Sequence, residues 1–219
     1  MCAQFALKIE ANQLRQKYNI NIREDLSLID SRYLPHSYAP VVVNSKGDKI
    51  LYPMRFSLIP NWSKESKVKF ATHNARVESV IEKPTWRIPF QSKHCLVPLT
   101  SFFEAAYTGP EAGNIIRFIE ADDKLLFAAG IFDYWKDSLS PEKNFYSFSI
   151  LTQEPSPFIL EHGHDRTPIF LKEDVAFDWL SLINQDERMI RDKLLKLSYY
   201  PSLKVEIDRP LKAGWEKRK

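Results

Sequence analysis

The chain has little cysteine, little net charge and no long apolar run, and each shortage argues against a class of protein. Only Cys2 and Cys95 occur among its 219 residues, whereas a secreted scaffold held by disulfides carries more cysteines in a regular pattern. No stretch approaches the roughly 20 apolar residues of a membrane-spanning helix. The N-terminus has no basic region followed by a long apolar run, so we identify no signal peptide. We therefore expect a soluble protein of a reducing compartment, the cytoplasm, without membrane contact.

The net charge is too small to identify a partner. Lysine and arginine number 31 and aspartate and glutamate 28, so the formal charge is only +3. Binding to a polyanion would require the basic residues to cluster in space, which composition cannot reveal. Apolar residues make up 44% of the chain, enough to bury a sizeable core, and the length favours one large domain over two small ones.

Turn residues and apolar spacing predict a β-rich α+β domain with helices mainly near its two ends. Leu7, Ala11, Leu14 and Tyr18 recur at helical spacing and predict an early amphipathic helix. Residues 63–70 are polar and rich in lysine, so we expect a surface loop there. The other predicted elements are two hairpins (41–43 with 49–52, and 115–119 with 125–131), strands at 54–59, 95–98, 101–105, 145–151 and 169–171, a short helix between Ser156 and Gly163, and helices at 174–182 and 186–197.

Cys2 becomes the first residue when methionine aminopeptidase removes Met1, a reaction that a small second residue permits. A terminal cysteine carries an α-amine and a thiol on adjacent carbons. The reference pKa of the α-amine is about 7.7–8.0, so a useful fraction is neutral near pH 7 and can attack an aldehyde to form an imine. The thiol can then close onto the imine carbon and give a five-membered thiazolidine. Cys2 alone does not distinguish this chemistry from a chance residue at an irregular N-terminus.

Two further segments hold polar groups in unusual surroundings. In residues 72–78, Arg76 can bind a phosphate in bidentate fashion, and Asn74 can orient a sugar hydroxyl or polarise an aldehyde oxygen. The alternative is a helix start with solvated charges. In residues 102–107, Glu104 lies among aromatic and small residues, where burial would raise its pKa and suit it to acid–base work. The alternative is a glutamate on an exposed strand face.

The fourth segment, residues 162–168, contains two histidines. His164 precedes an aspartate and an arginine and could move protons at neutral pH, or could cap the end of a helix. The spacing of His162 and His164 suggests a metal, but a zinc site needs further ligands and Cys95 is the only obvious one left. We therefore expect no metal and no cofactor.

The order and spacing of these segments, from residue 2 to about 180, resemble the SOS-response-associated-peptidase family, whose members include the eukaryotic abasic-site shield proteins. No single motif is decisive, but the joint pattern is specific. The matching stretches are 1–5, 32–33 with 39–40, 54–62, 74–78, 95–98 through 103–104, 129–131, 149–152 and 164–168. The resemblance implies a single α+β domain over 1–219 with a β-barrel-like antiparallel core and flanking helices, and it leaves the tail from about 208 to 219 uncertain.

The resemblance also implies the roles of individual residues. The catalytic residues would be Cys2, Asn74, Glu104 and His164. A positive groove leading to the terminal cysteine would bind the DNA backbone through Arg76, and Trp62 would lie near an aromatic wedge that stacks beside the lesion. The other residues expected to contact DNA are Lys64, Lys67, Lys69, Thr152 and Arg166.

The chain departs from the family pattern at several positions. Ala3 and Gln4 stand where Gly-Arg is usual, so we expect a slightly narrower site that lacks one phosphate contact. Basic residues of the 63–70 loop are the candidates to replace that contact. Phe56-Ser57 replaces the usual Trp-Gly, Thr167 replaces the usual Met, and Ala105-Ala106 follows Glu104 where Tyr/Phe-Glu-Trp patterns are common. These changes leave the four chemical groups intact.

The leading hypothesis is covalent capture of abasic sites in single-stranded DNA, which would shield the lesion during the DNA damage (SOS) response. Cys2 would form a thiazolidine with the ring-opened sugar, and strand cleavage by lyase chemistry would be a side activity. We expect a monomer that binds single-stranded DNA, with the replication machinery as a further candidate partner and with association with the nucleoid if the source is bacterial.

Three alternatives stay open. The first is a peptidase or amidohydrolase that uses Cys2 as an N-terminal nucleophile and removes Met1 by itself. The second is a non-enzymatic binder of modified or single-stranded nucleic acid. The third is a structural protein in which Cys2 is buried and inert.

Overall fold

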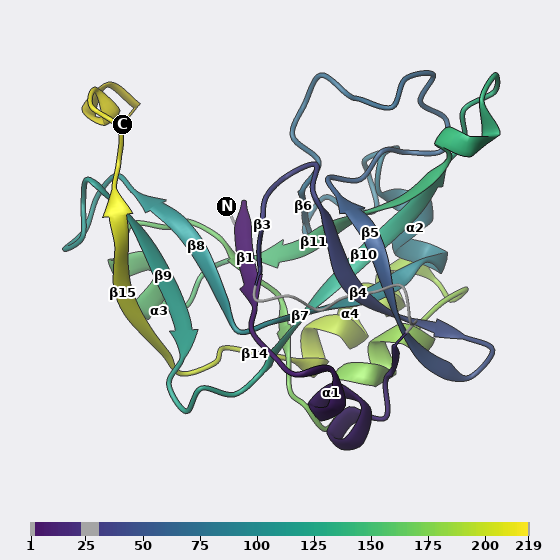
Figure 1. The fold of residues 1–219 in the computed structure, drawn as a ribbon, viewed down its shortest axis with the longest axis horizontal. Coiled ribbons are helices and arrows are strands. Elements are labelled where there is room, and N and C mark those ends of the chain that lie inside the picture. Colours follow the sequence, from purple (N-terminus) through teal and green to yellow (C-terminus); the bar gives the residue numbers. More distant parts are fainter. Residues whose placement is uncertain (1–2, 23–30, 219) are drawn as a thin grey trace.

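A closed ring of five strands forms the centre of the structure, a computed structural model that describes residues 3–22 and 31–218 (Figure 1). Each strand is hydrogen-bonded to the next, and the last returns to the first. In ring order they are β4 (Tyr38–Ser45), β5 (Asp48–Phe56), β11 (Phe145–Gln153), β10 (Leu126–Trp135) and β7 (His94–Leu99). All these pairings are antiparallel except that of β5 with β11. Closure removes the free edges that an open sheet would expose.

A second, antiparallel sheet lies beside this barrel. Its strand order is β15 (Leu203–Pro210), β9 (Asn114–Glu120), β8 (Ser101–Ala106), β1 (Gln4–Leu7) and β3 (Ser31–Tyr33). Thr100 alone separates β7 from β8, so the chain passes directly from the barrel into the sheet. An apolar cluster joins the two and is rich in phenylalanine, including Phe5, Phe56, Phe102 and Phe148. Burial of these side chains holds the sheet against the barrel.

Short strands extend the barrel where the predicted site residues lie. The last residues of β11 leave β5 and pair instead with β6 (Asn74–Arg76) on one side and β12 (Thr167–Pro168) on the other. This exchange of neighbours brings two segments about 90 residues apart in the chain to one end of β11. The remaining short strands are β2 (Asn21–Ile22), which pairs with β5, β13 (Phe170–Leu171), which pairs with β10, and β14 (Ser198–Tyr199), which pairs with β13.

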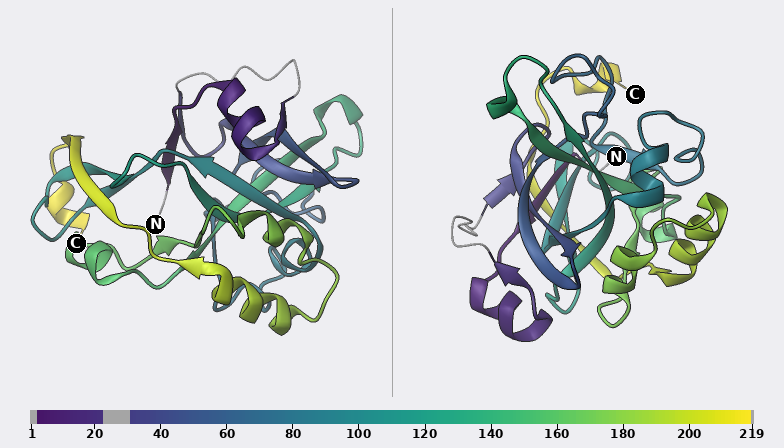
Figure 2. Two further views of the ribbon diagram at one scale, coloured as in Figure 1. Left: turned by 90° about the horizontal axis from the view of Figure 1, so that it is seen from below. Right: turned by 90° about the vertical axis from the view of Figure 1, so that its right-hand side faces the viewer.

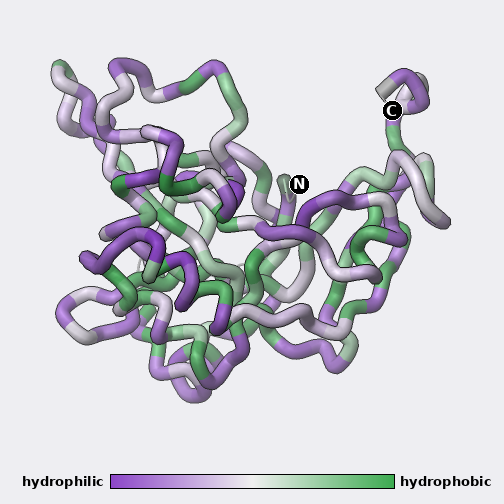
Figure 3. Tube along the Cα trace, turned by 180° about the vertical axis from the view of Figure 1, so that it is seen from behind, coloured by the Kyte–Doolittle hydropathy of each residue, from purple (hydrophilic) through white to green (hydrophobic). Residues whose placement is uncertain are grey.

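Most of the helices contribute to a second apolar cluster, whose barrel residues alternate along the strands with those of the first, whereas α3 (Pro157–Glu161) packs on the phenylalanine-rich cluster through Ile159. The other helices are α1 (Ala11–Tyr18), α2 (Arg87–Ser92) and α4 (Glu187–Leu197), with 3-10 turns η1 (Pro141–Lys143), η2 (Ala176–Ser181) and η3 (Trp215–Arg218). Figure 2 shows α1, in purple, and α4, in yellow-green, on different sides of the barrel. Hydrophobic residues concentrate in the packed strands and helices, and the outer loops are mainly hydrophilic (Figure 3). Of the helices in the described part of the chain, none has the length and apolarity to cross a membrane.

The predicted fold class, an α+β domain with a barrel-like, mainly antiparallel core and flanking helices, is confirmed. The hairpin around residues 45–48 is confirmed as β4 and β5. Two of the predicted helices begin at a side-chain cap. The Ser156 side chain accepts from the backbone N–H of Ile159, and the Asp186 side chain accepts from two N–H groups at the start of α4.

Two local predictions are wrong. Leu7 does not begin the first helix, because it belongs to β1 and its side chain enters the phenylalanine-rich cluster; the helix begins at Ala11. Residues 115–119 and 125–131 do not form a hairpin, because β9 belongs to the second sheet and β10 to the barrel. The Glu120 carboxylate accepts the N–H groups of Asp122 and Lys124, which stabilises a turn that carries the chain between them.

Trp179, in η2, ties the helical layer to the barrel. Its indole N–H donates to the carbonyl oxygens of Cys95 and Gly130, each 3.1 Å away, on the neighbouring strands β7 and β10. The ring is fully buried and stacks on His94 with a centroid distance of 3.6 Å. One side chain therefore connects three elements through both hydrogen bonds and packing.

Substitution Trp179→Phe should lower the free energy of unfolding by about 2–4 kcal/mol, because it removes the N–H donor and leaves a cavity. Trp62→Phe is the matched control: Trp62 is 57% exposed, and its loss should change stability by no more than about 0.5 kcal/mol. Urea unfolding of the two variants beside the wild type measures both values. Equal midpoints for the two variants would contradict the structural role of Trp179.

Candidate functional site

The predicted polar residues meet in a cavity of about 440 Å³ beside the start of β1. Its walls come from four segments that are distant in the sequence: the N-terminal residues, β6, the β8–β9 pair and the segment after α3. The lining residues are Ala3, Gln4, Arg76, Phe103, Glu104, Ala105, Tyr107, Ile115, Gly163, His164 and Asp165. The cavity therefore brings together three of the four segments that the sequence singled out, and the residue that follows Cys2.

Glu104 places a carboxyl group in this cavity with little access to water. It lies on β8 and is only 7% exposed, and the alternation of the strand puts it on the same face as the buried Phe102 and Ala106. Burial disfavours the ionised form and raises the pKa of Glu104 to about 7, and the negative charge of Asp165 adds to the effect. At neutral pH the group is thus present in both protonated and ionised forms.

His164 faces Glu104, with its Nδ1 3.9 Å from the carboxyl Oε2. Burial lowers the pKa of His164 to about 4, so the imidazole is neutral at pH 7. Its Nε2 is also buried and has no hydrogen-bond partner among the described residues. The two side chains therefore combine a group that exchanges protons at neutral pH with a neutral ring whose second nitrogen is left for a bound molecule.

Two glycines allow the loop after β8 to pack closely on the segment that carries His164. A Cβ on Gly163, whose φ is +83°, would lie 2.6 Å from the carbonyl oxygen of Thr108. A Cβ on Gly109, also at φ +83°, would lie 2.5 Å from the carbonyl oxygen of Glu161. The loop after β8 consequently packs backbone to backbone on the segment that carries His164, which only glycine permits at these positions.

β6 supplies Asn74 and Arg76. They pair with Ile150 and Thr152 of β11, and because they are two residues apart they share one side of the strand. Asn74 is 7% exposed and does not line the cavity, whereas Arg76 is exposed and does. β6 thus carries a cationic side chain at the cavity wall and a buried amide two residues before it.

Arg166 and Thr152, two of the predicted DNA contacts, lie inside the protein. Both terminal nitrogens of Arg166 donate to the Glu78 carboxylate, at 3.0 and 2.7 Å, and one also donates to the Thr152 carbonyl oxygen at 2.8 Å. Arg166 is 7% exposed and Thr152 is fully buried. The guanidinium thereby ties the residues after β6 to β11, and neither side chain presents a surface to which DNA could bind in this conformation.

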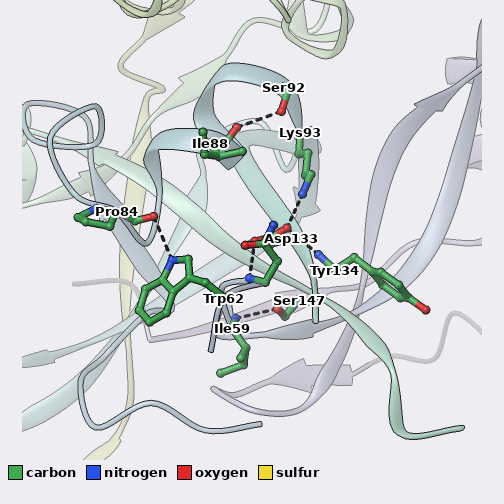
Figure 4. A network of polar contacts seen from close by, with 10 residues as sticks. Ile59, Trp62, Pro84, Ile88, Ser92, Lys93, Asp133, Tyr134 and Ser147 are labelled. Carbon is green, nitrogen blue, oxygen red and sulfur yellow. Dashed lines mark hydrogen bonds and ion pairs between the residues drawn. The ribbon is translucent and has the colours of Figure 1, made fainter. Parts of the chain in front are cut away.

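Trp62 and the lysines that follow it are on the surface. Trp62 is 57% exposed, and its indole N–H donates to the Pro84 carbonyl oxygen at 3.4 Å (Figure 4). The buried carboxylate of Asp133 anchors this segment: it accepts the Asn61 N–H at 2.8 Å and pairs with the Lys93 ammonium. The exposed lysines of the adjoining loop are Lys64, Lys67 and Lys69.

Sequence reasoning missed a cation beside the cavity, Arg32. Its Nε donates to the Gln4 side chain at 2.9 Å, its guanidinium lies 3.6 Å above the Phe103 ring, and its Nη1 bonds Asp208 at 2.9 Å. Because β3 and β15 are the two ends of the sheet order, this ion pair joins the sheet's edges and shows how strongly it curls. The sequence contained no local signal, since Asp208 is 176 residues away.

A second missed pair is Glu111 with His162. The carboxylate Oε2 lies 2.6 Å from the imidazole Nδ1, and both side chains are largely buried. The pair tethers the β8–β9 loop to the end of α3, two residues before His164. His162 was noticed in the sequence as a metal candidate. Across residues 3–22 and 31–218, however, no three His, Cys, Asp or Glu side chains are grouped to hold a metal ion.

Of the two cysteines, only Cys95 lies among the described residues. Cys2, the predicted nucleophile, lies outside the described residues, but Ala3, to which it is bonded, lines the cavity. Cys95 is a fully buried free thiol on β7, and its burial raises the pKa of the thiol far above the usual range. Cys95 is therefore an inert residue of the barrel core.

Comparison with curated proteins gives relatives along most of the chain. The abasic site processing protein YoqW of Bacillus subtilis is 31% identical over 201 residues, which cover 89% of this chain and 86% of the relative. The abasic site processing protein YobE of the same organism is 31% identical over 202 residues, covering 89% of each. The abasic site processing protein HMCES of Rattus norvegicus is 28% identical over 184 residues, 67% of this chain and 51% of the relative.

Solved structures share the fold. A crystal structure of a protein from Bordetella bronchiseptica matches 96% of this chain and 100% of that one, with a TM-score of 0.76 at 20% identity. A protein from Bacteroides thetaiotaomicron gives the same TM-score at 22% identity, over 95% of this chain and 92% of that one. The family model described as SOS response associated peptidase (SRAP) matches residues 1–207, which confirms the resemblance found in the sequence, and the chain therefore belongs to that family.

Proposed function

We propose that this chain processes abasic sites in DNA by covalent capture, through the terminal amine and thiol of Cys2 after removal of Met1. The observation that carries the proposal is the pairing of Glu104, with a pKa of about 7, and neutral His164 in a cavity that Ala3 also lines. The peptide bond fixes the Cys2 Cα about 3.8 Å from that of Ala3. Three curated relatives carry the name abasic site processing protein, which supports DNA with abasic sites as the substrate.

The proposed reaction has two bond-forming steps. The neutral α-amine of Cys2 adds to the aldehyde carbon of the ring-opened abasic sugar, and the resulting carbinolamine loses water to give an imine. The Cys2 thiol then adds across the C=N bond, its sulfur bonding to carbon and its proton passing to nitrogen. The product is a five-membered thiazolidine. No oxidant or further reactant is needed, and the ring lacks the C=N bond that promotes cleavage of the strand by β-elimination.

Glu104 transfers the protons, and His164 contacts the reacting oxygen. Glu104 takes a proton from the Cys2 amine as it attacks and returns one to the departing hydroxyl, which a carboxyl group with a pKa of about 7 does in either direction near neutral pH. His164 remains neutral and offers its Nε2 to the carbinolamine oxygen. Asn74 shares one side of β6 with Arg76 but is not a lining residue of the cavity; it is the further residue that we propose to polarise the aldehyde oxygen.

The DNA strand reaches this cavity over exposed cations and an aromatic ring. Arg76 binds backbone phosphate at the cavity wall, and Trp62 stacks on a base or in the gap that the missing base leaves. Lysines 64, 67 and 69 add sequence-independent attraction to phosphates. The buried pair Arg166 and Thr152 contributes indirectly, since Arg166 fixes the end of β6 on which Arg76 lies.

Substitution at Cys2 tests the covalent step. Wild-type protein with a confirmed N-terminal cysteine should give a slow-migrating, heat-resistant band with a single-stranded oligonucleotide that contains one abasic site. Cys2→Ala should give no durable band, and Cys2→Ser should form a reversible imine and nick the strand. Cys95→Ala is the matched control: its thiol is buried, so capture should be unchanged provided that the variant is folded by circular dichroism. Denaturing gels of the four proteins measure the yields.

Each contrary result has a separate meaning. A Cys2→Ser adduct as durable as that of the wild type would contradict ring closure by the thiol. No wild-type band would contradict capture itself. Turnover of peptides without DNA would then favour the N-terminal-nucleophile peptidase that the family's name describes.

Glu104→Gln should slow capture and stabilise the fold. The amide cannot transfer protons, so the rate of adduct formation should fall by about 10²- to 10⁴-fold. Burial raises the folded-state pKa of Glu104 from 4.5 to about 7, so the folded protein holds the proton more tightly than the unfolded chain does. The contribution of Glu104 to stability is therefore fully present below about pH 4.5 and is lost as the pH rises through about 7.

The variant should consequently match the wild type in unfolding free energy near pH 4 and exceed it by up to about 3 kcal/mol at pH 8. Urea unfolding at pH 4, 6 and 8 measures this difference, and single-turnover gels measure the rate. Glu120→Gln, which replaces a buried glutamate outside the cavity, is the control and should leave the rate unchanged. Wild-type capture rates in Glu104→Gln would remove Glu104 from the mechanism.

A further inference from the structure

A second cavity, of about 370 Å³, adjoins the first. One wall is the C-terminal segment, which contributes Lys212 and Trp215. Ala105, Ile115 and Arg209 are cross-strand neighbours on β8, β9 and β15, so they form its floor, and Tyr107, which follows β8, also lines it. Ala105, Tyr107 and Ile115 also line the cavity that contains Glu104 and His164. The two cavities are therefore continuous along β8 and β9, and we call the second one the C-terminal groove.

The C-terminal segment is held in place. After β15 pairs with β9 as far as Pro210, the Leu211 N–H donates to the Gly113 carbonyl oxygen at 2.8 Å. The Trp215 indole then packs on Gly113, where a Cβ would lie 3.0 Å from the ring atom Cζ2. Figures 1 and 3 show the segment at the edge of the molecule, beyond the tip of β15. These two contacts hold the C-terminal segment on the loop between β8 and β9.

The chemistry of the groove matches a nucleic-acid strand. Its lining includes the cations Arg209 and Lys212, and it includes no carboxylate. Two acids flank the C-terminal lining in the sequence: Asp208, which pairs with Arg32 at 2.9 Å and lies 3.6 Å from Arg209, and Glu216, which follows Trp215. Two aromatic side chains, Tyr107 and Trp215, contribute ring surface. Cations that follow phosphates, combined with aromatic rings on which bases stack, are the usual means of binding single strands without regard to sequence.

The groove also depends on residues beyond the family match. The family model ends at residue 207, whereas Arg209, Lys212 and Trp215 follow it.

We propose that the C-terminal groove binds the nucleotides on one side of the abasic site, with phosphates at Arg209 and Lys212 and a base on the Trp215 indole. The inference rests on the proposed function, because the abasic sugar in the first cavity is what brings the flanking strand over β8 and β9. The groove raises affinity for the strand and takes no part in the covalent chemistry. It also gives the protein a polarity on DNA, since only one flank enters it.

Binding of undamaged single strands tests the groove without the covalent step. Fluorescence anisotropy compares the wild type, Lys212→Ala, Trp215→Ala and the conservative Trp215→Phe, with Lys196→Ala on α4 as the control, since Lys196 is exposed and lines neither cavity. Trp215→Ala should weaken binding about 5-fold or more, and Trp215→Phe should retain most of the affinity. Lys212→Ala should reduce the magnitude of the slope of log K against log salt concentration by about 0.7, which corresponds to the loss of one phosphate contact. Lys196→Ala should match the wild type.

Capture rates then locate the flank. Oligonucleotides with the abasic site at the centre, at the 5′ end or at the 3′ end are compared at limiting protein. Trp215→Ala should slow capture about 5-fold on the probe with a central abasic site and on the terminal probe that keeps the flank bound by the groove. On the terminal probe that lacks this flank, the capture rate of Trp215→Ala should equal that of the wild type. Equal rates on all three probes, with melting temperatures unchanged, would overturn the inference and leave capture intact. If the wild type forms no adduct, the proposed function fails, and the anisotropy measurements still decide whether the groove binds single strands.

Discussion

The candidate site depends on the burial of one carboxyl group. Glu104 lies where the second sheet meets the barrel, and the loss of water there raises its pKa to about 7. A solvated carboxyl group would be fully ionised at neutral pH, and His164, 3.9 Å away, would then gain a proton more readily. Burial therefore favours the uncharged forms of both Glu104 and His164. The phenylalanine-rich cluster packs the second sheet against the barrel, and the two glycines pack the loop after β8 on the segment that carries His164.

The barrel and the second sheet have separate parts in forming the site. The barrel supplies β6 through the exchange of partners at the end of β11, so Asn74 and Arg76 are carried by the rigid element of the fold. The sheet supplies Glu104 from β8 and reaches the N-terminal residues through β1, which pairs with β8 at Gln4. Gln4, at the start of β1, thus lies directly beside the strand that carries the buried carboxyl group. The curl of the sheet, held by Arg32 and Asp208, then turns β15 toward the same face.

The sequence predicted those parts of this arrangement that have local signals. Turn residues around Gly47 and the caps Ser156 and Asp186 marked real boundaries, because turns and caps are decided within a few residues. It failed at residues 115–131, because two strands joined by a tight turn usually pair and only the tertiary fold sends them to different sheets. The pairing of Arg32 with Asp208 and the C-terminal groove were not predicted, for the same reason. The residues near Glu104 were found by resemblance to a family, since no local rule predicts which glutamate is buried beside which histidine.

In the proposed reaction, the raised pKa of Glu104 makes deprotonation of the Cys2 amine less costly. In the proposed reaction a proton moves from the α-ammonium group of Cys2, with a pKa of about 8, to the carboxylate. With an ordinary glutamate pKa of about 4.3, this transfer would be unfavourable by about 5 kcal/mol. The ammonium group and the carboxylate would then remain an ion pair, in which the amine is protonated and unreactive. With a pKa of about 7 the cost falls to about 1 kcal/mol, so the neutral amine is accessible and the protonated carboxyl group is ready to release the hydroxyl as water. Because His164 is neutral, it can contact the reacting oxygen without adding a positive charge that would pair with the Glu104 carboxylate in place of the Cys2 ammonium group.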